Sequence, residues 1–248
     1  ELRAAIELIQ DCYNVLGFTG FSYRLSLRDP NDTEKYFQDD EMWNSAEAQL
    51  REGLGKMGLE FYESPGDAAF YGPKVDIQVR SALGKDETLS TVQLDFLLPQ
   101  KFELEYVAED GSRQRPVMIH RGLLSTMERM TAFLIEQTAG NFPLWLAPRQ
   151  VAIIPIADRH NDYAWELRNE LHAAGLRVEV DDSSNRMQAK VREAELSRIP
   201  FMLIVGDKEQ EAREVSLRER TPEGTQERKG VKFDELKAEL IKRRDTRA

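Results

Sequence analysis

Residues 118–129, MIHRGLLSTMER, change from strand-like to helical spacing within a few positions. The run from Arg115 to Ile119 is typical of a strand. It is followed by a helical pattern that closes near Gly140 and carries one apolar face, made of Leu123, Met127, Met130 and Leu134. This stretch therefore predicts a strand that leads directly into a helix, with His120 at the end of the strand.

Upstream of this junction the apolar residues follow a helical spacing first and a strand-like spacing later. One stripe from Leu2 to Leu16 predicts a helix that ends near Gly17. A second stripe from Trp43 to Met57 predicts a helix that Asp39 or Asp40 caps and that ends before Gly58. Beyond Glu60 four runs are strand-like, and together they predict an antiparallel meander with a hairpin turn at 109–111: Ala69–Val79, Thr91–Leu98, Phe102–Val107 and Arg115–Ile119.

Downstream, the segment 141–148 contains two prolines and marks a domain boundary, so that we expect domains at residues 1–146 and 147–248. The second domain alternates strands and helices, which predicts an α/β domain with a largely parallel sheet. A hairpin around Thr221-Pro222-Glu223-Gly224 and a terminal helix complete it. The expected elements of the alternating part are strands 151–157, 176–180 and 201–205 and helices 162–174 and 187–196.

Composition restricts the class of protein. Of the 248 residues, 41% are hydrophobic and 31% are charged, which is the balance of a soluble globular chain, and the length suits two domains. No run of eighteen apolar residues and no signal or transit peptide is present, so a cytoplasmic location without membrane contact is expected. The single cysteine, Cys12, excludes an intrachain disulfide, and its place in the first helical stripe predicts an inert core residue. The net charge of -10 argues against nonspecific coating of nucleic acid, but a local basic patch could still bind RNA.

The stretch from His120 to Arg129 resembles motif 3 of class II aminoacyl-tRNA synthetases, a strand followed by a helix that carries an arginine. In that family the arginine binds ATP, and a guanidinium suits this role because it can lie flat on adenine while its charge offsets phosphate. The resemblance therefore implies that Arg129 binds ATP. Without it, Arg129 would be read as an ordinary arginine on a helix surface.

Further stretches resemble the threonyl-tRNA synthetase family in order and spacing. They are Asp40-Glu41-Met42-Trp43, Ala69-Phe70-Tyr71-Gly72-Pro73-Lys74, Thr91-Val92-Gln93-Leu94-Asp95-Phe96 and Met118-Ile119-His120-Arg121. The resemblance implies the C-terminal portion of such an enzyme, with part of an antiparallel-sheet class II catalytic domain followed by a mixed-sheet α/β anticodon-binding domain. The family's motif 1, which builds a dimer interface, its motif 2 and its editing domain are expected upstream of Glu1. One departure is Thr88, where family members often carry a glutamine near adenine.

Four residues of the first domain gain roles from this resemblance. His120 matches one of three protein ligands of a catalytic Zn²⁺ that binds threonine, and the other two ligands are missing here. Tyr71, Lys74 and Gln93 match residues that line the pocket near the amino acid and the α-phosphate, where positioning and charge supply most of the catalysis. Read from the residues alone, His120 could be a satisfied core histidine, and the other three could be ordinary strand and turn residues.

Two residues of the second domain match positions that read the anticodon. The resemblance gives Glu209 a contact to a base edge and Arg218 a similar role, for which planar donors are suited. A third family position, an asparagine, is Ser184 here. The alternative for Glu209 and Arg218 is a cross-strand ion pair on a solvated end of the sheet.

The resemblance thus implies a threonine–tRNA ligase that uses ATP with Mg²⁺, threonine and tRNA(Thr) and is homodimeric when complete, with Zn²⁺ in the complete enzyme. Residues 1–248 alone are expected to be incompetent. The alternative is a non-catalytic relative that binds RNA or serves as an accessory protein, although such a protein would have no need for Lys74, Gln93, His120 and Arg129.

Overall fold

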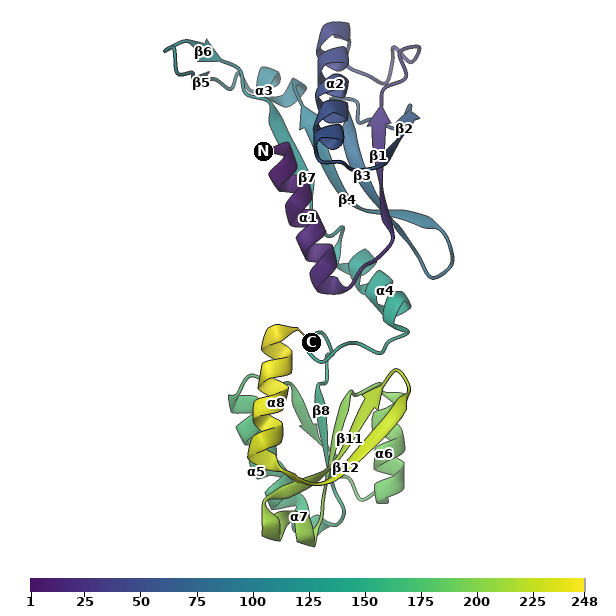
Figure 1. Ribbon diagram of the computed structural model, residues 1–248, viewed down its shortest axis with the longest axis vertical. Coiled ribbons are helices and arrows are strands. Elements are labelled where there is room, and N and C mark those ends of the chain that lie inside the picture. Colours follow the sequence, from purple (N-terminus) through teal and green to yellow (C-terminus); the bar gives the residue numbers. More distant parts are fainter. Residues whose placement is uncertain (248) are drawn as a thin grey trace. The chain divides into compact units, whose positions relative to one another are not determined.

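The computed structural model describes residues 1–247 and divides the chain into two compact units, Glu1–Glu136 and Gln137–Ala248 (Figure 1). The first unit is an antiparallel α+β structure, and the second is a mixed α/β structure, as the sequence predicts. None of the helices within the described part of the chain is both long enough and apolar enough to cross a membrane.

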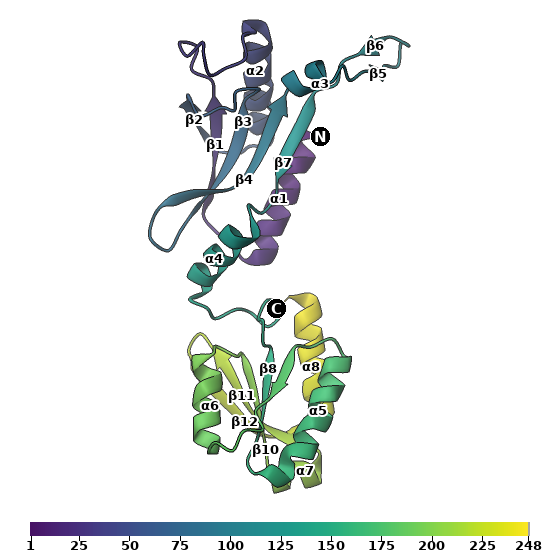
Figure 2. The same ribbon diagram turned by 180° about the vertical axis from the view of Figure 1, so that it is seen from behind.

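The first unit is built on a five-stranded sheet with the order β2-β1-β3-β4-β7. All neighbouring strands are antiparallel except β1 and β2, which are parallel. The bounds are β1 Phe21–Leu27, β2 Phe61–Pro65, β3 Lys74–Arg80, β4 Asp86–Asp95 and β7 Met118–Gly122. Two helices, α1 (Leu2–Leu16) and α2 (Asp40–Lys56), pack on one face of this sheet, and Figure 2 shows the sheet from its opposite face.

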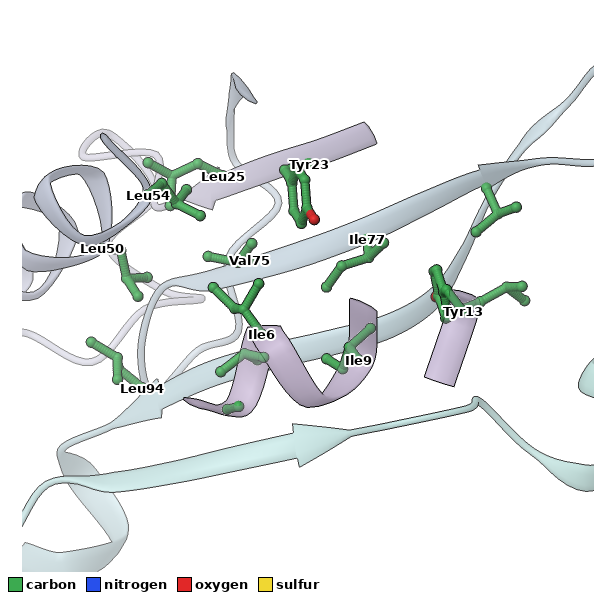
Figure 3. Packing of buried hydrophobic residues seen from close by; sticks show 14 of the residues in the cluster. Ile6, Ile9, Tyr13, Tyr23, Leu25, Leu50, Leu54, Val75, Ile77 and Leu94 are labelled. Carbon is green, nitrogen blue, oxygen red and sulfur yellow. The ribbon is translucent and has the colours of Figure 1, made fainter. Parts of the chain in front are cut away.

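The core of this unit joins the apolar stripes of the two helices to alternate residues of the strands. Ile6 and Ile9 of α1 and Leu50 of α2 meet Val75 and Ile77 of β3, and all five are at most 1% exposed (Figure 3). Since side chains alternate across a strand, burying Val75 and Ile77 turns the residues between them to the opposite face. The polar face of the sheet is a consequence of this core.

The ends of both helices follow the predicted signals. Gly17 ends α1 in the left-handed conformation, with φ 74°. The side chain of Asp39 caps α2 by accepting a hydrogen bond from the Met42 backbone N–H at 2.9 Å. Cys12 is only partly buried, so the prediction that it is a core residue is wrong; it lies beside the α1 stripe rather than on it.

Several strand predictions in this unit need correction. The run Ala69–Val79 is a strand only from Lys74, because residues 69–73 form a turn that is closed by a bridge between Ala69 and Gly72. The run Thr91–Leu98 begins earlier, at Asp86, and turns into a short helix, α3 (Leu97–Lys101), at its end. The run Phe102–Val107 is extended only at β5 (Tyr106–Val107), which pairs with β6 (Arg113–Gln114) across the predicted turn. Strands β1 and β2 were not predicted. The predicted helix after β7 is α4 (Met127–Thr138).

The second unit contains a five-stranded sheet with the order β12-β11-β10-β8-β9. Its strands β8 (Val151–Pro155), β9 (Val178–Val180) and β10 (Phe201–Val205) are parallel, and β11 (Glu214–Thr221) and β12 (Gly224–Lys232) extend it as an antiparallel hairpin. Helices α5 (Asn161–Ala173) and α8 (Phe233–Thr246) cover one face, and α6 (Met187–Leu196) covers the other. A 3-10 turn, η1 (Asp158–His160), precedes α5, and a short helix, α7 (Asp207–Ala212), follows β10.

Candidate functional site

Three of the predicted site residues form one row across the first sheet. Lys74 of β3 pairs with Gln93 of β4, and Gln93 pairs in turn with His120 of β7. Residues directly opposite each other on antiparallel strands project from the same face. The backbone register therefore places a cation, an amide and an imidazole side by side on the face opposite α1 and α2.

Tyr71 joins this row from the turn before β3. Its hydroxyl donates a hydrogen bond to Oε1 of Gln93 at 2.6 Å, and its ring makes an edge contact with the His120 ring at 5.7 Å between centroids. Burial and the nearby charge of Asp95 raise the pKa of Tyr71, so the phenol stays protonated and acts as a donor. With its oxygen turned to Tyr71, the Gln93 side chain has a fixed orientation.

The turn that carries Tyr71 depends on Gly72. A Cβ at this position would lie 1.9 Å from the carbonyl oxygen of Leu94, because the turn runs directly against β4. The Leu94 backbone N–H also donates to the carbonyl of Pro73 at 3.1 Å. Only glycine permits this approach, which brings Tyr71 over the sheet.

His120 has a carboxylate partner that the sequence did not indicate. Nε2 of His120 lies 2.7 Å from Oδ2 of Asp95, and the Asp95 side chain is wholly buried. The other carboxylate oxygen of Asp95 accepts hydrogen bonds from the backbone N–H groups of Leu97 and Leu98, each at 2.9 Å. Asp95 is therefore held rigidly at the start of α3 and fixes one nitrogen of the His120 ring. Asp95 lies two residues after Gln93 on the same strand and therefore on the same face, and this spacing is the sequence signal that could have indicated it.

Lys74 also has a buried carboxylate partner. Nζ of Lys74 lies 2.6 Å from Oδ2 of Asp76, which is wholly buried and also accepts from Arg24 at 2.9 Å and from Ser26 at 2.8 Å. Thr91 donates to the other oxygen at 2.7 Å. Burial alone would raise the pKa of Asp76, but the hydrogen bonds from Lys74 and Thr91 outweigh it and lower the pKa. Lys74 and Arg24 thus share this carboxylate, and Arg24 also lies 3.4 Å from the carboxylate of Asp67, so that two cations and two carboxylates form one network.

Arg129 lies apart from the row. Its side chain is 53% exposed, and its guanidinium lies 3.7 Å from Glu87 near the opposite end of β4. Beside Glu87, Thr88 accepts a hydrogen bond from Nε2 of Gln78 at 2.6 Å. Thr88 and Gln93 are separated by about 17 Å at the usual rise of a strand. The row thus lies at one end of β4, and Arg129 and Thr88 lie near the other. Thr88 is opposite Gln78 on the polar face, whereas Glu87, the contact of Arg129, is opposite Val79 of the buried face.

The residues present do not fit a complete metal site. Across residues 1–247, no group of three or more His, Cys, Asp or Glu side chains is placed to hold a metal ion. His120 has Asp95 beside it, and a protein zinc site needs three ligands or more.

In the second unit the structure separates Glu209 from Arg218. Glu209 accepts hydrogen bonds from the Gly206 backbone N–H at 3.1 Å and from the Ser216 hydroxyl at 2.8 Å. Arg218 donates to Glu227, which is opposite it on β12, and lies 3.5 Å from Glu195 of α6. Glu209 and Arg218 therefore do not form an ion pair with each other. Arg218 does form a cross-strand ion pair, but its partner is Glu227.

Arg218 lines a groove of about 640 Å³ between α6 and the β11–β12 hairpin. Val191 and Ile204 contribute apolar surface to this groove, and Arg192 and Lys229 contribute positive charge. Ser216, the partner of Glu209, also lines it. Ser184 lies in the loop before α6. An apolar wall next to planar cationic donors is the kind of surface on which an unpaired base can stack and be read.

Comparison with known families decides the identity of the first unit. The family model described as "tRNA synthetase class II core domain (G, H, P, S and T)" matches residues 1–138. The chain belongs to the class II aminoacyl-tRNA synthetases. A second model, "Anticodon binding domain", matches residues 150–243.

The similar members of this synthetase family are threonine–tRNA ligases. The chain is 62% identical over 248 residues to the one from Deinococcus radiodurans and 53% identical over 242 residues to the one from Staphylococcus saprophyticus. It is covered to 100% and 97%, respectively, but spans only 38% and 37% of the length of these relatives. The chain thus corresponds to a C-terminal portion of such synthetases, which confirms the resemblance.

Solved synthetase structures share the fold. The crystal structure titled as the RNA binding domain of threonyl-tRNA synthetase from Cryptosporidium parvum superposes with a TM-score of 0.87 at 35% identity, covering 97% of this chain and 59% of that chain. A putative threonyl-tRNA synthetase from Aeropyrum pernix gives a TM-score of 0.74 at 26% identity, covering 98% of this chain and 61% of that chain.

Proposed function

We propose that residues 1–248 supply part of the active site and the anticodon-reading surface of a threonine–tRNA ligase. The observation that carries this proposal is the row of Lys74, Gln93 and His120, with Tyr71 bonded to Gln93, on the polar face of a class II core. ATP, as its Mg²⁺ complex, and threonine are the proposed small-molecule substrates, and tRNA(Thr) is the proposed acceptor. A cytoplasmic location and a homodimeric complete enzyme are proposals that follow from the family alone.

The residues at the two ends of β4 suggest how the adenylate would lie. Lys74 would neutralise charge that develops at the α-phosphate, while Gln93 and Tyr71 would orient the amino acid. Arg129 would leave its exposed contact with Glu87 and lie on the adenine near the other end of β4. His120 would contribute to the end that holds threonine, as the one proposed zinc ligand of this chain.

Lys74 is able to change partners without leaving Asp76 uncompensated. When its ammonium turns toward a phosphate, Arg24 and two hydroxyl groups still donate to the same carboxylate. Removing one partner of a buried charge is normally costly. A second cation on Asp76 reduces this cost, which suits a lysine that must move between a resting contact and a ligand.

A chimeric enzyme tests the catalytic part of the proposal. Residues 1–248 would replace the matching portion of the Deinococcus radiodurans ligase, and threonine-dependent pyrophosphate exchange would be measured. We expect exchange in the chimera and a loss of about 100-fold in kcat for Lys74→Met, since one preorganised charge is removed from the transition state. Lys85→Met, an exposed turn lysine, is the matched control and should leave kcat unchanged. An inactive, correctly folded chimera would favour the non-catalytic alternative.

A titration tests the RNA-binding part. Residues 1–248 and the Arg218→Ala variant would be titrated with a threonine anticodon stem-loop and with stem-loops altered at one base. Loss of a planar base contact should cost about 1 to 3 kcal/mol on the cognate RNA and relax discrimination at one position. Equal losses of affinity for every stem-loop would show that Arg218 contacts the RNA backbone and does not read a base.

A further inference from the structure

Three arginines surround the C-terminal end of α6 without a carboxylate of their own. Arg192 lies in the helix, Arg198 lies just after it, and Arg220 lies on β11. No Asp or Glu oxygen of residues 1–247 approaches within 4.0 Å of these three guanidinium groups, whereas Arg213, Arg218 and Arg243 in the same unit each have such a partner. The three charges are therefore not neutralised within the chain.

Arg220 carries a donor that lacks an acceptor. Its Nη1 is buried, and no hydrogen-bond acceptor is placed within reach among residues 1–247. Burial lowers the pKa of Arg220, and the charge of Arg198 lowers it further, so the two guanidinium groups repel each other. Buried donors are nearly always satisfied, and an orphaned one indicates a missing partner. An anion between the two arginines would supply the acceptor and remove the repulsion.

The backbone holds these two side chains next to each other. The Arg220 N–H donates to the carbonyl of Pro200 at 2.9 Å, two residues after Arg198. Arg198 itself has a left-handed backbone, with φ 58°, at a helix end where glycine would be free of strain. Its guanidinium is exposed and has one long contact, 3.4 Å to Oδ1 of Asn141. The charge of Arg198 therefore remains available to a ligand.

The neighbouring surface connects this pair to the groove that contains Arg218. A smaller hollow of about 240 Å³ is lined by Arg192, Glu195, Leu196 and Arg198. Arg192 and Glu195 also line the larger groove, so the two hollows are neighbours along α6. The carboxylate of Glu195 lies 3.5 Å from Arg218. A ligand that reaches Arg218 can continue along α6 toward Arg198.

We propose that Arg198 and Arg220 bind a phosphate of the RNA backbone, one or more nucleotides away from the base that contacts Arg218. This inference rests on the proposed RNA-binding function and adds a sequence-independent contact to it. Phosphate contacts of this kind position an RNA without reading it, and they make affinity depend on salt.

The salt dependence of stem-loop binding tests the proposal. Residues 1–248, Arg198→Gly and Arg220→Gln would be titrated with the threonine anticodon stem-loop at several salt concentrations. Each substitution should reduce the slope of log K against log salt by about 0.7 to 0.9 and weaken cognate and base-altered stem-loops equally. Arg198→Gly also relieves the left-handed backbone, so a fall in its slope cannot be attributed to unfolding. Arg168→Gln, on α5 at the opposite face of the sheet, is the control of equal charge and should keep the wild-type slope.

The outcomes separate this inference from the proposed function. If wild type binds no stem-loop, the proposed RNA-binding function fails, and this site fails with it. If wild type binds but both variants keep the wild-type slope, the phosphate site alone is wrong. A parallel titration with inorganic phosphate would follow the Nε–Hε signal of Arg220 by NMR. Saturation by phosphate with an unchanged RNA slope would mean that the site holds a free anion, which also overturns the RNA assignment.

Discussion

Nζ of Lys74 lies 2.6 Å from a carboxylate oxygen of Asp76, two residues along the same strand, and the Asp76 side chain is wholly buried. Arg24 reaches the same oxygen from the neighbouring strand β1. The proposed phosphate-binding lysine is therefore part of a charged network that belongs to the structure of the sheet. Changes to this network should affect stability as well as activity.

Asp76→Asn should destabilise the chain by about 3 kcal/mol, because Lys74 and Arg24 would lose the carboxylate that compensates them. Urea unfolding of residues 1–248 measures this cost. Asp86→Asn is the matched control, since Asp86 forms an exposed pair with Arg80 at 3.5 Å and such pairs contribute less than about 1 kcal/mol. Equal costs for the two variants would contradict a structural role for Asp76.

The lowered pKa of Asp76 predicts that its contribution to the free energy of unfolding depends on pH. Because the pKa of Asp76 is lowered in the folded state, its carboxylate binds a proton less readily there than in the unfolded chain. The stabilisation is complete above the ordinary value of 3.8 and is lost as the pH falls through the lower folded pKa. The difference in unfolding free energy between wild type and Asp76→Asn should therefore shrink below pH 3.8. A constant difference across this range would show that Asp76 does not titrate as described.

Gly72→Ala should be severely destabilising, by about 3 kcal/mol or more, because its methyl group would collide with the Leu94 carbonyl. Gly55→Ala is the control. Gly55 is exposed in α2 with nothing within 4 Å of an added Cβ, so this change should stabilise by up to about 1 kcal/mol. Thermal unfolding of both variants gives the comparison, and a tolerated Gly72→Ala would mean that the turn over β4 can move.

Tyr71 and Gln93 should be energetically coupled through their hydrogen bond. A double-mutant cycle with Tyr71→Phe and Gln93→Ala should give a coupling of about 0.5 to 1.5 kcal/mol in urea unfolding. Ser45 and Gln49, which share an exposed bond at 3.1 Å in α2, provide a cycle in which little coupling is expected. Additive losses at Tyr71 and Gln93 would show that the amide is not held by the phenol.

Residues 1–248 should retain much less than one zinc per chain after dialysis, since one histidine beside one carboxylate cannot hold the metal tightly. Elemental analysis of the purified chain and of His120→Ala should give the same low content. One tightly bound zinc that His120→Ala abolishes would show that further ligands gather around His120.

The second unit was largely predictable because its signals are local. Strands β8 and β10 are short apolar runs, and helices α5, α6 and α8 each have their own apolar stripe. The first unit was harder, and β4 shows why. A bulge next to Gln78 puts both Leu89 and Ser90 on the core side, so the alternation that marks a strand is broken and its first residues were missed. For β1 the alternating residues from Phe21 to Leu27 were a readable signal that was overlooked.

The residues of the candidate site were also predictable only in part. Motif resemblance was sufficient to nominate Lys74, Gln93, Tyr71 and His120, which the structure brings together, and Arg129, which lies near the far end of β4. It assigned no role to Asp76 or Asp95. Besides Lys74 of its own strand, Asp76 binds Arg24 and Ser26 of β1, and Asp95 binds His120 of β7, and these cross-strand contacts are not visible in the sequence. Pairing across strands depends on register, and register requires the three-dimensional structure.

Register also determines where this chain can change in length. Inserting or deleting one residue within β3 would turn the residues on one side of the change to the opposite face, so that either Lys74 would leave its place beside Gln93 or the buried residues of β3 would leave the core. The hairpin at residues 81–85, by contrast, can lengthen without disturbing a single pairing in the row. Natural variation in length among related sequences should therefore collect in that hairpin, and indels within the paired parts of β3 and β4 should be purged by selection.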